Sequence, residues 1–371
     1  MAFKGWMLLL GGLVVVAVAA AVLLLVLPES VEAISVRWEE STHANAESLA
    51  FTFWEEQGLG DVPRQCARCH STPGNRDFLG ADGTAAGTVE EAPERGSVIN
   101  CSACHNPPAH ELSRVSYPSG IAIDDLGASA VCHVCHQGRR AGEDVRQMTE
   151  GIEPDDTSPD LVFINVHYYI AASTWLGGEV EVGYQYPDRT YVNRYEHVPD
   201  MQRCVECHNP HSQTVDPEKC SPCHVTVVDR GDLSGIRIDE TDYDGDGTVE
   251  EEGLGGEIET MQERLYAAMQ TYASQELTPL VYADRSPYFF IDSDGDGEAD
   301  EDEIDDRNAY RTWTPRLLRA AYNYHFSQQD PGNYAHNARY VIQLLYDSLA
   351  DLGEQIPVEL ESLVRPEPYE N

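Results

Sequence analysis

Five short cysteine motifs constrain this chain more than any other feature. Each reads Cys-x-x-Cys-His, and together they contain all ten cysteines of the sequence. Two thiols at this spacing can form thioether bonds to the two vinyl groups of one haem, and the adjacent histidine can bind the iron from one face. The predicted attachment residues are Cys66, Cys69 and His70; Cys101, Cys104 and His105; Cys132, Cys135 and His136; Cys204, Cys207 and His208; and Cys220, Cys223 and His224.

Other uses of paired cysteines fit this pattern poorly. A zinc site or a redox dithiol does not need a histidine directly after the second cysteine, and neither predicts one five times in five. A disulfide framework would not produce this spacing either. The motifs therefore predict five covalently bound c haems.

The composition limits the fold and the partners. The chain has 371 residues and a formal net charge of -40, which excludes nucleic acid as a partner because phosphate binding needs clustered Lys and Arg. Haems can supply much of the apolar interior, so the polypeptide can wrap them with few regular elements. We expect a multihaem cytochrome c fold that is mostly irregular and α-helical, with a small β-hairpin and a core of stacked haems.

The N-terminal stretch predicts attachment to a membrane. Residues 7–27 form an apolar run of 21 residues, which is long enough to cross a bilayer as a helix. Lys4 precedes the run, and Glu29 and Glu32 follow it, so the rest of the chain is expected on the extracytoplasmic side, periplasmic or extracellular. The alternative is a cleaved signal peptide, because Val31-Glu32-Ala33 would suit a signal peptidase.

The order of motifs and composition predicts four parts of the chain. These are an anchor or signal (1–30), a pentahaem domain (31–236), an acidic calcium-binding region resembling EF-hands (237–306) and a C-terminal helical hairpin that packs on the haem core (307–371). Helices are expected at 38–57, at 257–275, after the N-cap Thr314 and at 335–352, where Val341, Leu345, Leu349 and Leu352 form a buried stripe. Alternating apolar residues at 179–186, a turn and a return at 191–195 predict a β-hairpin.

Eight histidines lie outside the proximal positions and could bind the opposite faces of the irons. His133 lies between two attached cysteines, where it could hardly reach another iron. His211 is three residues after the proximal His208, so it should bind a neighbouring haem rather than the same one. The predicted distal ligands are His43, His167, His197, His211 and His336. His325 is the first alternative and His110 the second.

Two acidic loops predict calcium. The loop from Asp292 to Glu303 matches the EF-hand pattern at every key position, with the turn glycine Gly297 and a closing glutamate. The loop from Asp242 begins in the same way, but its twelfth position is Gly253, so one or two calcium ions are expected. The predicted ligands are Asp242, Asp244, Asp246, Thr248 and Glu250 in the first loop and Asp292, Asp294, Asp296, Glu298, Asp300 and Glu303 in the second.

Several of these segments together resemble a known family. The segments are Thr42-His43-Ala44, residues 66–71, 77–83, 117–120 and 135–139, and Ala335-His336-Asn337. They resemble the polyhaem membrane-associated cytochromes c of bacterial respiratory chains, and the resemblance covers nearly the whole chain after residue 30. It implies an extracytoplasmic electron carrier with bis-histidine haems, and it names no donor or acceptor.

Two functions follow from these observations. The first is electron transfer without catalysis, linking a respiratory or photosynthetic membrane complex to an external acceptor or donor. Redox proteins such as other cytochromes or a quinol-oxidising complex would be the partners, and a homo-oligomer or haem filament remains open. The alternative is a nitrite-, hydroxylamine- or tetrathionate-type reductase, which would need one haem with an open coordination position.

Overall fold

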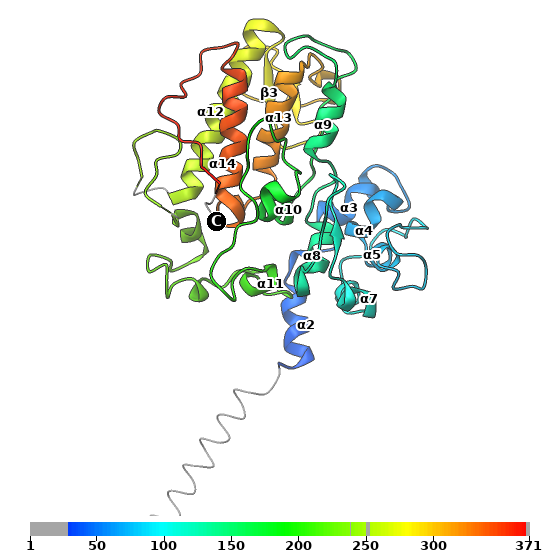
Figure 1. The fold of residues 1–371 in the computed structure, drawn as a ribbon. Helices are drawn as coiled ribbons and strands as arrows, with labels where there is room; N and C mark the ends of the chain where they lie inside the picture. The colour runs from blue at the N-terminus through cyan, green and yellow to red at the C-terminus, as the bar shows by residue number, and fades with distance from the viewer. Residues whose placement is uncertain (1–28, 238, 250–252, 369–371) are drawn as a thin grey trace, which may run out of the picture.

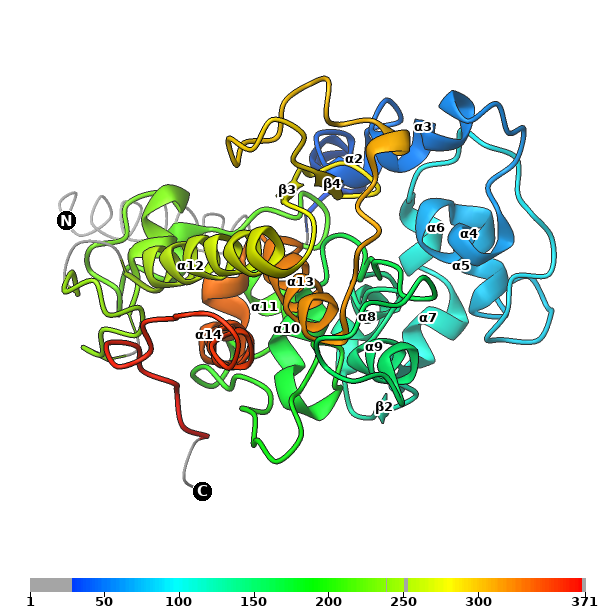
Figure 2. The ribbon, with the colours of Figure 1, turned by 90° about the horizontal axis from the view of Figure 1, so that it is seen from above.

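The computed structural model describes residues 29–237, 239–249 and 253–368. Short helices from the first part of the chain gather beside three long helices from the last part (Figures 1 and 2). The shorter helices are α2 (Val31–Glu39), α3 (Leu49–Glu56), α4 (Arg64–His70), α5 (Thr72–Phe78), α6 (Cys101–Cys104), α7 (Pro107–Glu111), α8 (Ala130–Cys135), α9 (Gly142–Thr149), α10 (Ala171–Leu176) and α11 (Cys204–Cys207). Short 3₁₀ segments lie between these helices at η1 (Thr42–Ala44), η2 (Gly127–Ser129) and η3 (Gly177–Glu179), and after α11 at η4 (Pro217–Lys219) and η5 (Arg230–Gly235).

Polar side chains start several of these helices just before or just after a cysteine motif. The Ser71 hydroxyl accepts from the Gly74 amide at 3.0 Å, at the point where α4 ends and α5 begins. The Asn100 side chain caps α6 in the same way, and that of Asn106 caps α7. N-caps satisfy amides that a short helix cannot pair internally. The caps therefore fix where the motif helices begin and end.

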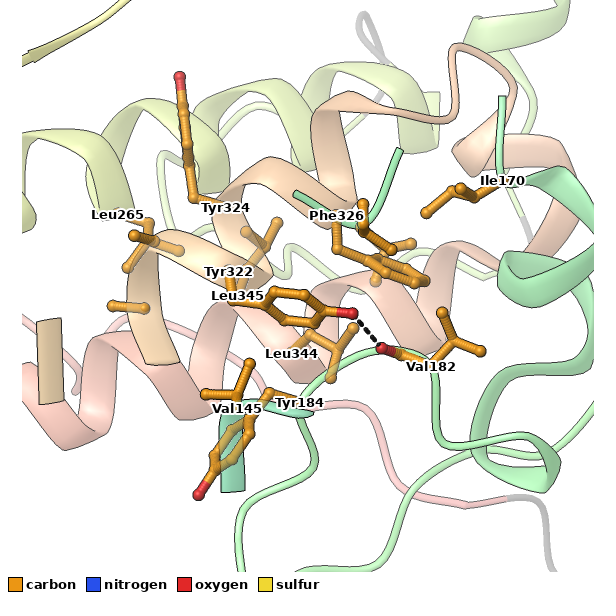
Figure 3. Close-up of a cluster of buried hydrophobic side chains, with 14 of the residues drawn as sticks. Val145, Ile170, Val182, Tyr184, Leu265, Tyr322, Tyr324, Phe326, Leu344 and Leu345 are labelled. Carbon is orange, nitrogen blue, oxygen red and sulfur yellow. Dashed lines mark hydrogen bonds between the residues drawn. The ribbon is translucent and has the colours of Figure 1, made fainter. Parts of the chain in front are cut away.

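The long helices form the apolar core. They are α12 (Gly253–Glu276), α13 (Pro315–Gln328) and α14 (Asn333–Leu352). The predicted N-cap is confirmed, because the Thr314 hydroxyl accepts from the Leu317 amide at 3.2 Å. The predicted stripe of α14 is confirmed as well, since all four of its apolar residues are buried. Figure 3 shows the middle of this core, where Tyr322 and Phe326 of α13 lie beside Leu344 and Leu345 of α14.

The β-hairpin predicted at 179–195 is wrong, because these residues form the turn η3 and extended chain without strand pairing. Side chains of α13 instead form hydrogen bonds with the backbone of this segment. The Tyr322 hydroxyl donates to the Val182 carbonyl at 2.8 Å, the dashed line in Figure 3. The Asn323 side chain accepts from the Tyr184 amide at 2.9 Å and donates to its carbonyl at 3.0 Å. The alternating apolar residues are buried as predicted, but against helices rather than in a ladder.

Small antiparallel hairpins do occur elsewhere. Strands β1 (Val115–Ser116) and β2 (Ala122–Ile123) pair between the second and third motifs. Strands β3 (Leu280–Tyr282) and β4 (Phe289–Ile291) pair after α12, with Val281 opposite Phe290. The second acidic loop follows β4 directly, and the turn η6 (Asp306–Asn308) ends that region. Small hairpins are thus present between the second and third motifs and before the second acidic loop, instead of at residues 179–195.

The other predicted elements differ in part. The helix predicted at 38–57 is broken: α2 ends at Glu39, η1 places His43 in a tight turn, and α3 starts at Leu49. The predicted membrane segment at 7–27 lies outside the described residues, and within the described ranges no helix is long and apolar enough to cross a bilayer. The predicted division into four parts stays a prediction.

Candidate haem and metal centres

Each of the five motifs forms a single helical turn. The first four motifs lie in α4, α6, α8 and α11, and the fifth follows the turn η4. In motifs two to five, the histidine amide donates to the carbonyl of the first cysteine at 2.8–3.0 Å. A helical turn brings residues three apart to the same side, so the two thiols of each motif can reach one haem. None of these ten cysteines, which all lie within the described residues, forms a disulfide.

The structure brings every motif histidine close to a different histidine from outside the motifs. The centres of the paired imidazole rings lie 5.8–6.3 Å apart. The partners are the five histidines that the sequence predicted as distal ligands. The pairs are His70 with His167, His105 with His211, His136 with His43, His208 with His336 and His224 with His197.

This spacing fits two imidazoles on opposite sides of one metal ion. A metal–imidazole nitrogen bond is about 2 Å long, so two bonds in line put the nitrogens about 4 Å apart. Each ring centre lies about 1 Å beyond its nitrogen, which gives roughly 6 Å between centres. The residues present therefore fit five bis-histidine haems, each with its own attachment motif.

Three motif histidines are oriented by main-chain carbonyls. Nδ1 of His70 lies 2.8 Å from the Ala50 carbonyl, and Nδ1 of His136 lies 2.9 Å from that of Tyr169. Nδ1 of His208 lies 3.0 Å from the carbonyl of Gln213. An Nδ1–H bond to a carbonyl fixes the tautomer and leaves Nε2 for a metal.

Burial keeps two of the predicted distal histidines neutral. Burial and, to a smaller degree, the neighbouring His136 lower the pKa of His43 to about 4. Burial, followed by the charge on His70, lowers the pKa of His167 to about 3. An imidazole must be neutral to bind iron, so these environments hold the form that a ligand needs.

The backbone at His167 is in an unusual conformation. Its φ is 88°, and that of Tyr169 is 52°, in the left-handed region that non-glycine residues seldom adopt. The Asn165 side chain accepts from the His167 amide at 2.6 Å and so holds the turn. The same asparagine donates to the Tyr288 hydroxyl at 2.9 Å, which ties the turn to the β3–β4 hairpin. Such strain is found at functional positions, as expected for a ligand that must face a particular direction.

The remaining histidines lie in different surroundings. His325 is fully buried, with Nδ1 3.2 Å from the Tyr282 hydroxyl and Nε2 2.9 Å from the Asn165 side chain. His133 is also fully buried, with Nδ1 against the Tyr117 hydroxyl and Nε2 3.8 Å from the Cys204 sulfur. Both nitrogens of each ring have partners, so neither histidine has one left for an iron.

His110 is the exception among these three. Its ring lies 5.8 Å from that of His105, beside the second motif, and its side chain is exposed. His211 lies 6.2 Å from the same ring and stacks on it at 12°. Motif two therefore has two histidine neighbours, and His211 remains the predicted ligand.

Gln213 connects three of the five centres and was missed by the sequence analysis. Its side-chain oxygen accepts from the amide of His43 at 3.4 Å, and its side-chain nitrogen donates to the carbonyl of His211 at 3.0 Å. Its own carbonyl is the partner of His208. A glutamine carries no sequence signal for such a role, because the contact with His43 joins segments 170 residues apart in the chain.

Neighbouring motifs contact one another in a defined order. The Cys69 sulfur lies 3.9 Å from the Val134 carbonyl, and the Cys135 sulfur lies 3.6 Å from the Arg68 carbonyl, which joins motifs one and three. The contact between Cys204 and His133 joins motifs three and four. Lys219, directly before motif five, donates to a carbonyl within motif four at 3.3 Å. The contacts run from motif one through three and four to five.

The two acidic loops share one backbone pattern. In the first loop, the Asp242 carboxylate accepts from the amides of Gly245 and Gly247 at 2.6 and 3.0 Å. In the second, the Asp292 carboxylate accepts from the glycine amides at the same two positions, at 2.7 and 3.1 Å. All four glycines have positive φ, between 72° and 87°. The carboxylates of Asp242, Asp244 and Asp246 converge in the first loop, and those of Asp292, Asp294 and Glu303 converge in the second.

The loops differ in the glutamate that closes them. Glu303 accepts from the Ser293 amide at 2.5 Å with one oxygen, and its other oxygen is buried without a partner. The first loop has no glutamate at that position, but Glu257 of α12 accepts from the Tyr243 and Asp244 amides at 2.7 and 3.0 Å. Its second oxygen binds Arg237. Glu257 lies four residues after Gly253, the twelfth position of the first loop, and holds that loop in place of a closing glutamate. The sequence analysis missed this role.

Burial also changes the pKa of a carboxyl group in the first loop. Asp244 is fully buried and has a carboxylate oxygen without a partner. Burial, and to a smaller degree the neighbouring carboxylate of Glu257, raise the pKa of Asp244 to about 6. A cation held between the carboxylates would relieve this repulsion. The predicted ligand Glu250 lies outside the described residues.

Comparison with curated proteins agrees with this chemistry. The C-type polyheme cytochrome OmcB of Geobacter sulfurreducens is 26% identical over 349 residues, which cover 80% of this chain and 44% of the relative. The chain is related to the polyhaem c-type cytochromes. OmcC of the same organism is 26% identical over 368 residues, covering 83% of this chain and 45% of that relative. The chain thus spans less than half the length of these relatives. No protein-family model and no solved structure matches it.

Proposed function

We propose that this polyhaem chain carries electrons through five covalently bound c haems, each with two histidine ligands. The observation that carries the proposal is the set of five imidazole pairs, each made of one motif histidine and one histidine from elsewhere. A haem iron with two histidine ligands has no free position for a substrate, so its chemistry is electron transfer. The chain's own residues attach each haem, orient its axial rings and bury it.

The contacts between motifs support an order for the electron path. We propose that electrons pass between haems one, three, four and five, in the order in which their motifs touch. Haem two would join beside haem four, because its predicted distal ligand His211 lies in the turn that follows His208. The name of the relatives, C-type polyheme cytochrome, supports the same class of function.

We further propose that the haem region works outside the cytoplasm and is anchored by residues 7–27. Covalent attachment of haem c and the charge pattern around the apolar run support this location. The partners would be redox proteins, such as other cytochromes or a quinol-oxidising membrane complex. Assembly into a homo-oligomer or filament is part of the same hypothesis.

Ligation can be tested on the mature protein. Its mass should exceed that of the polypeptide by five haem groups after denaturation. The electron paramagnetic resonance spectrum of the oxidised protein should contain low-spin haem only, and the reduced protein should bind no carbon monoxide. A high-spin signal with binding of carbon monoxide would contradict five bis-histidine haems and favour the reductase alternative.

We also propose that the acidic loops bind calcium, with Asp292, Asp294 and Glu303 as the core of the stronger site. The buried oxygen of Glu303 without a partner supports this, because an isolated buried carboxylate is costly unless it meets a cation. The first loop would bind more weakly, since Arg237 already neutralises the glutamate that holds it. Asp296, Glu298 and Asp300 in the second loop, and Thr248 and Glu250 in the first, complete the proposed ligand sets.

Removal of calcium tests the proposed sites in the two acidic loops. A chelator should lower the melting temperature of the parent protein, because unneutralised carboxylates then repel one another. Glu303→Gln should lose most of that response. Glu301→Gln is the matched control, since Glu301 is an exposed acid of the same loop outside the ligand pattern. A chelator without effect on the parent would refute a structural calcium site.

A further inference from the structure

One axial histidine has a partner of a different kind from the others. Nδ1 of His336 lies 3.0 and 2.8 Å from the two carboxylate oxygens of Asp330. His70, His136 and His208 instead have neutral main-chain carbonyls at this nitrogen. All ten paired histidines lie in the described ranges, and among them His336 is the one bonded to a carboxylate.

Asp330 is held in place and screened from water. It is 2% exposed, and its carboxylate also accepts from the Gly332 amide at 3.1 Å and from the Thr174 hydroxyl. Within the described residues, no Arg or Lys forms an ion pair with it; the ring of His336 is its side-chain partner at Nδ1. The ring packs closely on Gly332, where an added Cβ would lie 2.7 Å from Cε1 of His336. The carboxylate and the imidazole therefore keep one relative position.

We propose that Asp330 makes the haem of motif four the one of lowest potential in the array. The inference rests on the proposed function, in which His208 and His336 bind the iron of this haem. A carboxylate that accepts the Nδ1–H makes the imidazole a more basic ligand, and a more basic ligand stabilises Fe(III) relative to Fe(II). The buried negative charge acts in the same direction, because reduction adds one electron beside it.

The haem of motif four lies between those of motifs three and five, so its potential would affect electron transfer along the array. Motif four contacts motif three through Cys204 and His133, and motif five through Lys219. An electron that moves between haems three and five thus crosses the haem that is hardest to reduce. Haem four would be the last to become reduced in an equilibrium titration, so it would limit transfer between the two ends of the array.

The test is a redox titration of the mature five-haem protein, followed by optical and paramagnetic resonance spectra. In Asp330→Asn, the midpoint potential of one of the five haems should rise by at least about 59 mV. For one electron, this corresponds to a tenfold change in the Fe(III)/Fe(II) equilibrium. All five haems should remain low-spin. Asp330→Glu, which keeps a carboxylate, should leave that midpoint closer to the parent value.

Asp347→Asn is the control for the loss of one buried negative charge. Asp347 is buried on α14 and pairs with Arg365, away from the axial histidines. The proposal is overturned if Asp330→Asn moves no midpoint beyond the change in Asp347→Asn, if all five midpoints move together, or if a high-spin haem appears. Failure of the proposed function itself would be visible separately, as a high-spin haem in the parent protein.

Discussion

Removing His336 tests whether the C-terminal helices belong to the redox core. The chain passes its last cysteine motif at His224, and the next histidine that pairs with a motif histidine is His336 on α14. The helix is interrupted directly after His336, where Asn337 has φ -168° and ψ 73° and donates to the carbonyls of Trp175 and Asn193. These bonds fix the ring beside His208, at 6.3 Å between centres.

The structure sets the size of the expected change. His336→Ala takes one axial ligand from one haem in five, so the low-spin signal should fall by about one fifth. Reduced protein should bind about one carbon monoxide per molecule, where the parent binds none. The substitution also leaves the Asp330 carboxylate buried without the ring N–H that it accepts, and we expect a loss of about 1–3 kcal/mol in the free energy of unfolding.

The assay combines paramagnetic resonance of the oxidised protein with carbon monoxide titration of the reduced protein. His325→Gln is the matched control, because His325 is a buried histidine of the same helical hairpin whose two nitrogens bind Tyr282 and Asn165. The control should keep all five haems low-spin. Parent-like spectra and no bound carbon monoxide in His336→Ala would refute the assignment, and a high-spin haem in His325→Gln would transfer it to that residue.

Three further predictions address the packing around the centres. Gly332→Ala places a Cβ against the ring of His336, so the g values of one low-spin haem should change while the other four stay as they are. Asn323→Ala leaves the amide and carbonyl of Tyr184 buried without partners, and urea unfolding should show a loss of roughly 2–4 kcal/mol. Burial, and to a smaller degree the charge on His167, lower the pKa of His325 to about 3, so the folded protein keeps it neutral while the unfolded chain can protonate it. The free energy of unfolding should therefore fall as the pH drops below about 6.5, and His325→Gln should remove about 2 kcal/mol of the difference between pH 7 and pH 5.

The attachment sites could be predicted from the sequence because they are local. Two cysteines and a histidine within five residues define each site whatever the rest of the chain does. The distal ligands had to come from the eight histidines outside the proximal positions, and the structure brings each of the five predicted ones beside a different motif histidine. Their assignment to particular motifs depends on how distant segments pack, and no pattern in the sequence specifies that.

The wrong and missed predictions also arise because distant segments pack together in ways that the sequence pattern does not specify. Alternation of Val180, Val182 and Tyr184 correctly indicated burial, but the partners were Tyr322 and Asn323 of a distant helix rather than a second strand. Asp330 and Glu257 were missed for a related reason. Asp330 precedes Pro331 and Gly332, so its sequence context indicates only a turn, and Glu257 lies outside the twelve-residue spacing of an EF-hand.

The five histidine pairs also bear on the order in which the protein can mature. His197 and His224 are close in sequence, so under the proposed function the two ligands of haem five would meet early in folding. His208 must wait for His336, which lies more than a hundred residues later, and closing a loop of that length carries a larger entropic cost. Under the proposed function, haem four would therefore gain its second histidine ligand later than haem five. Until α12 to α14 fold, His208 would lack its partner ring, so the folding rate of these helices would set how long that centre stays incomplete.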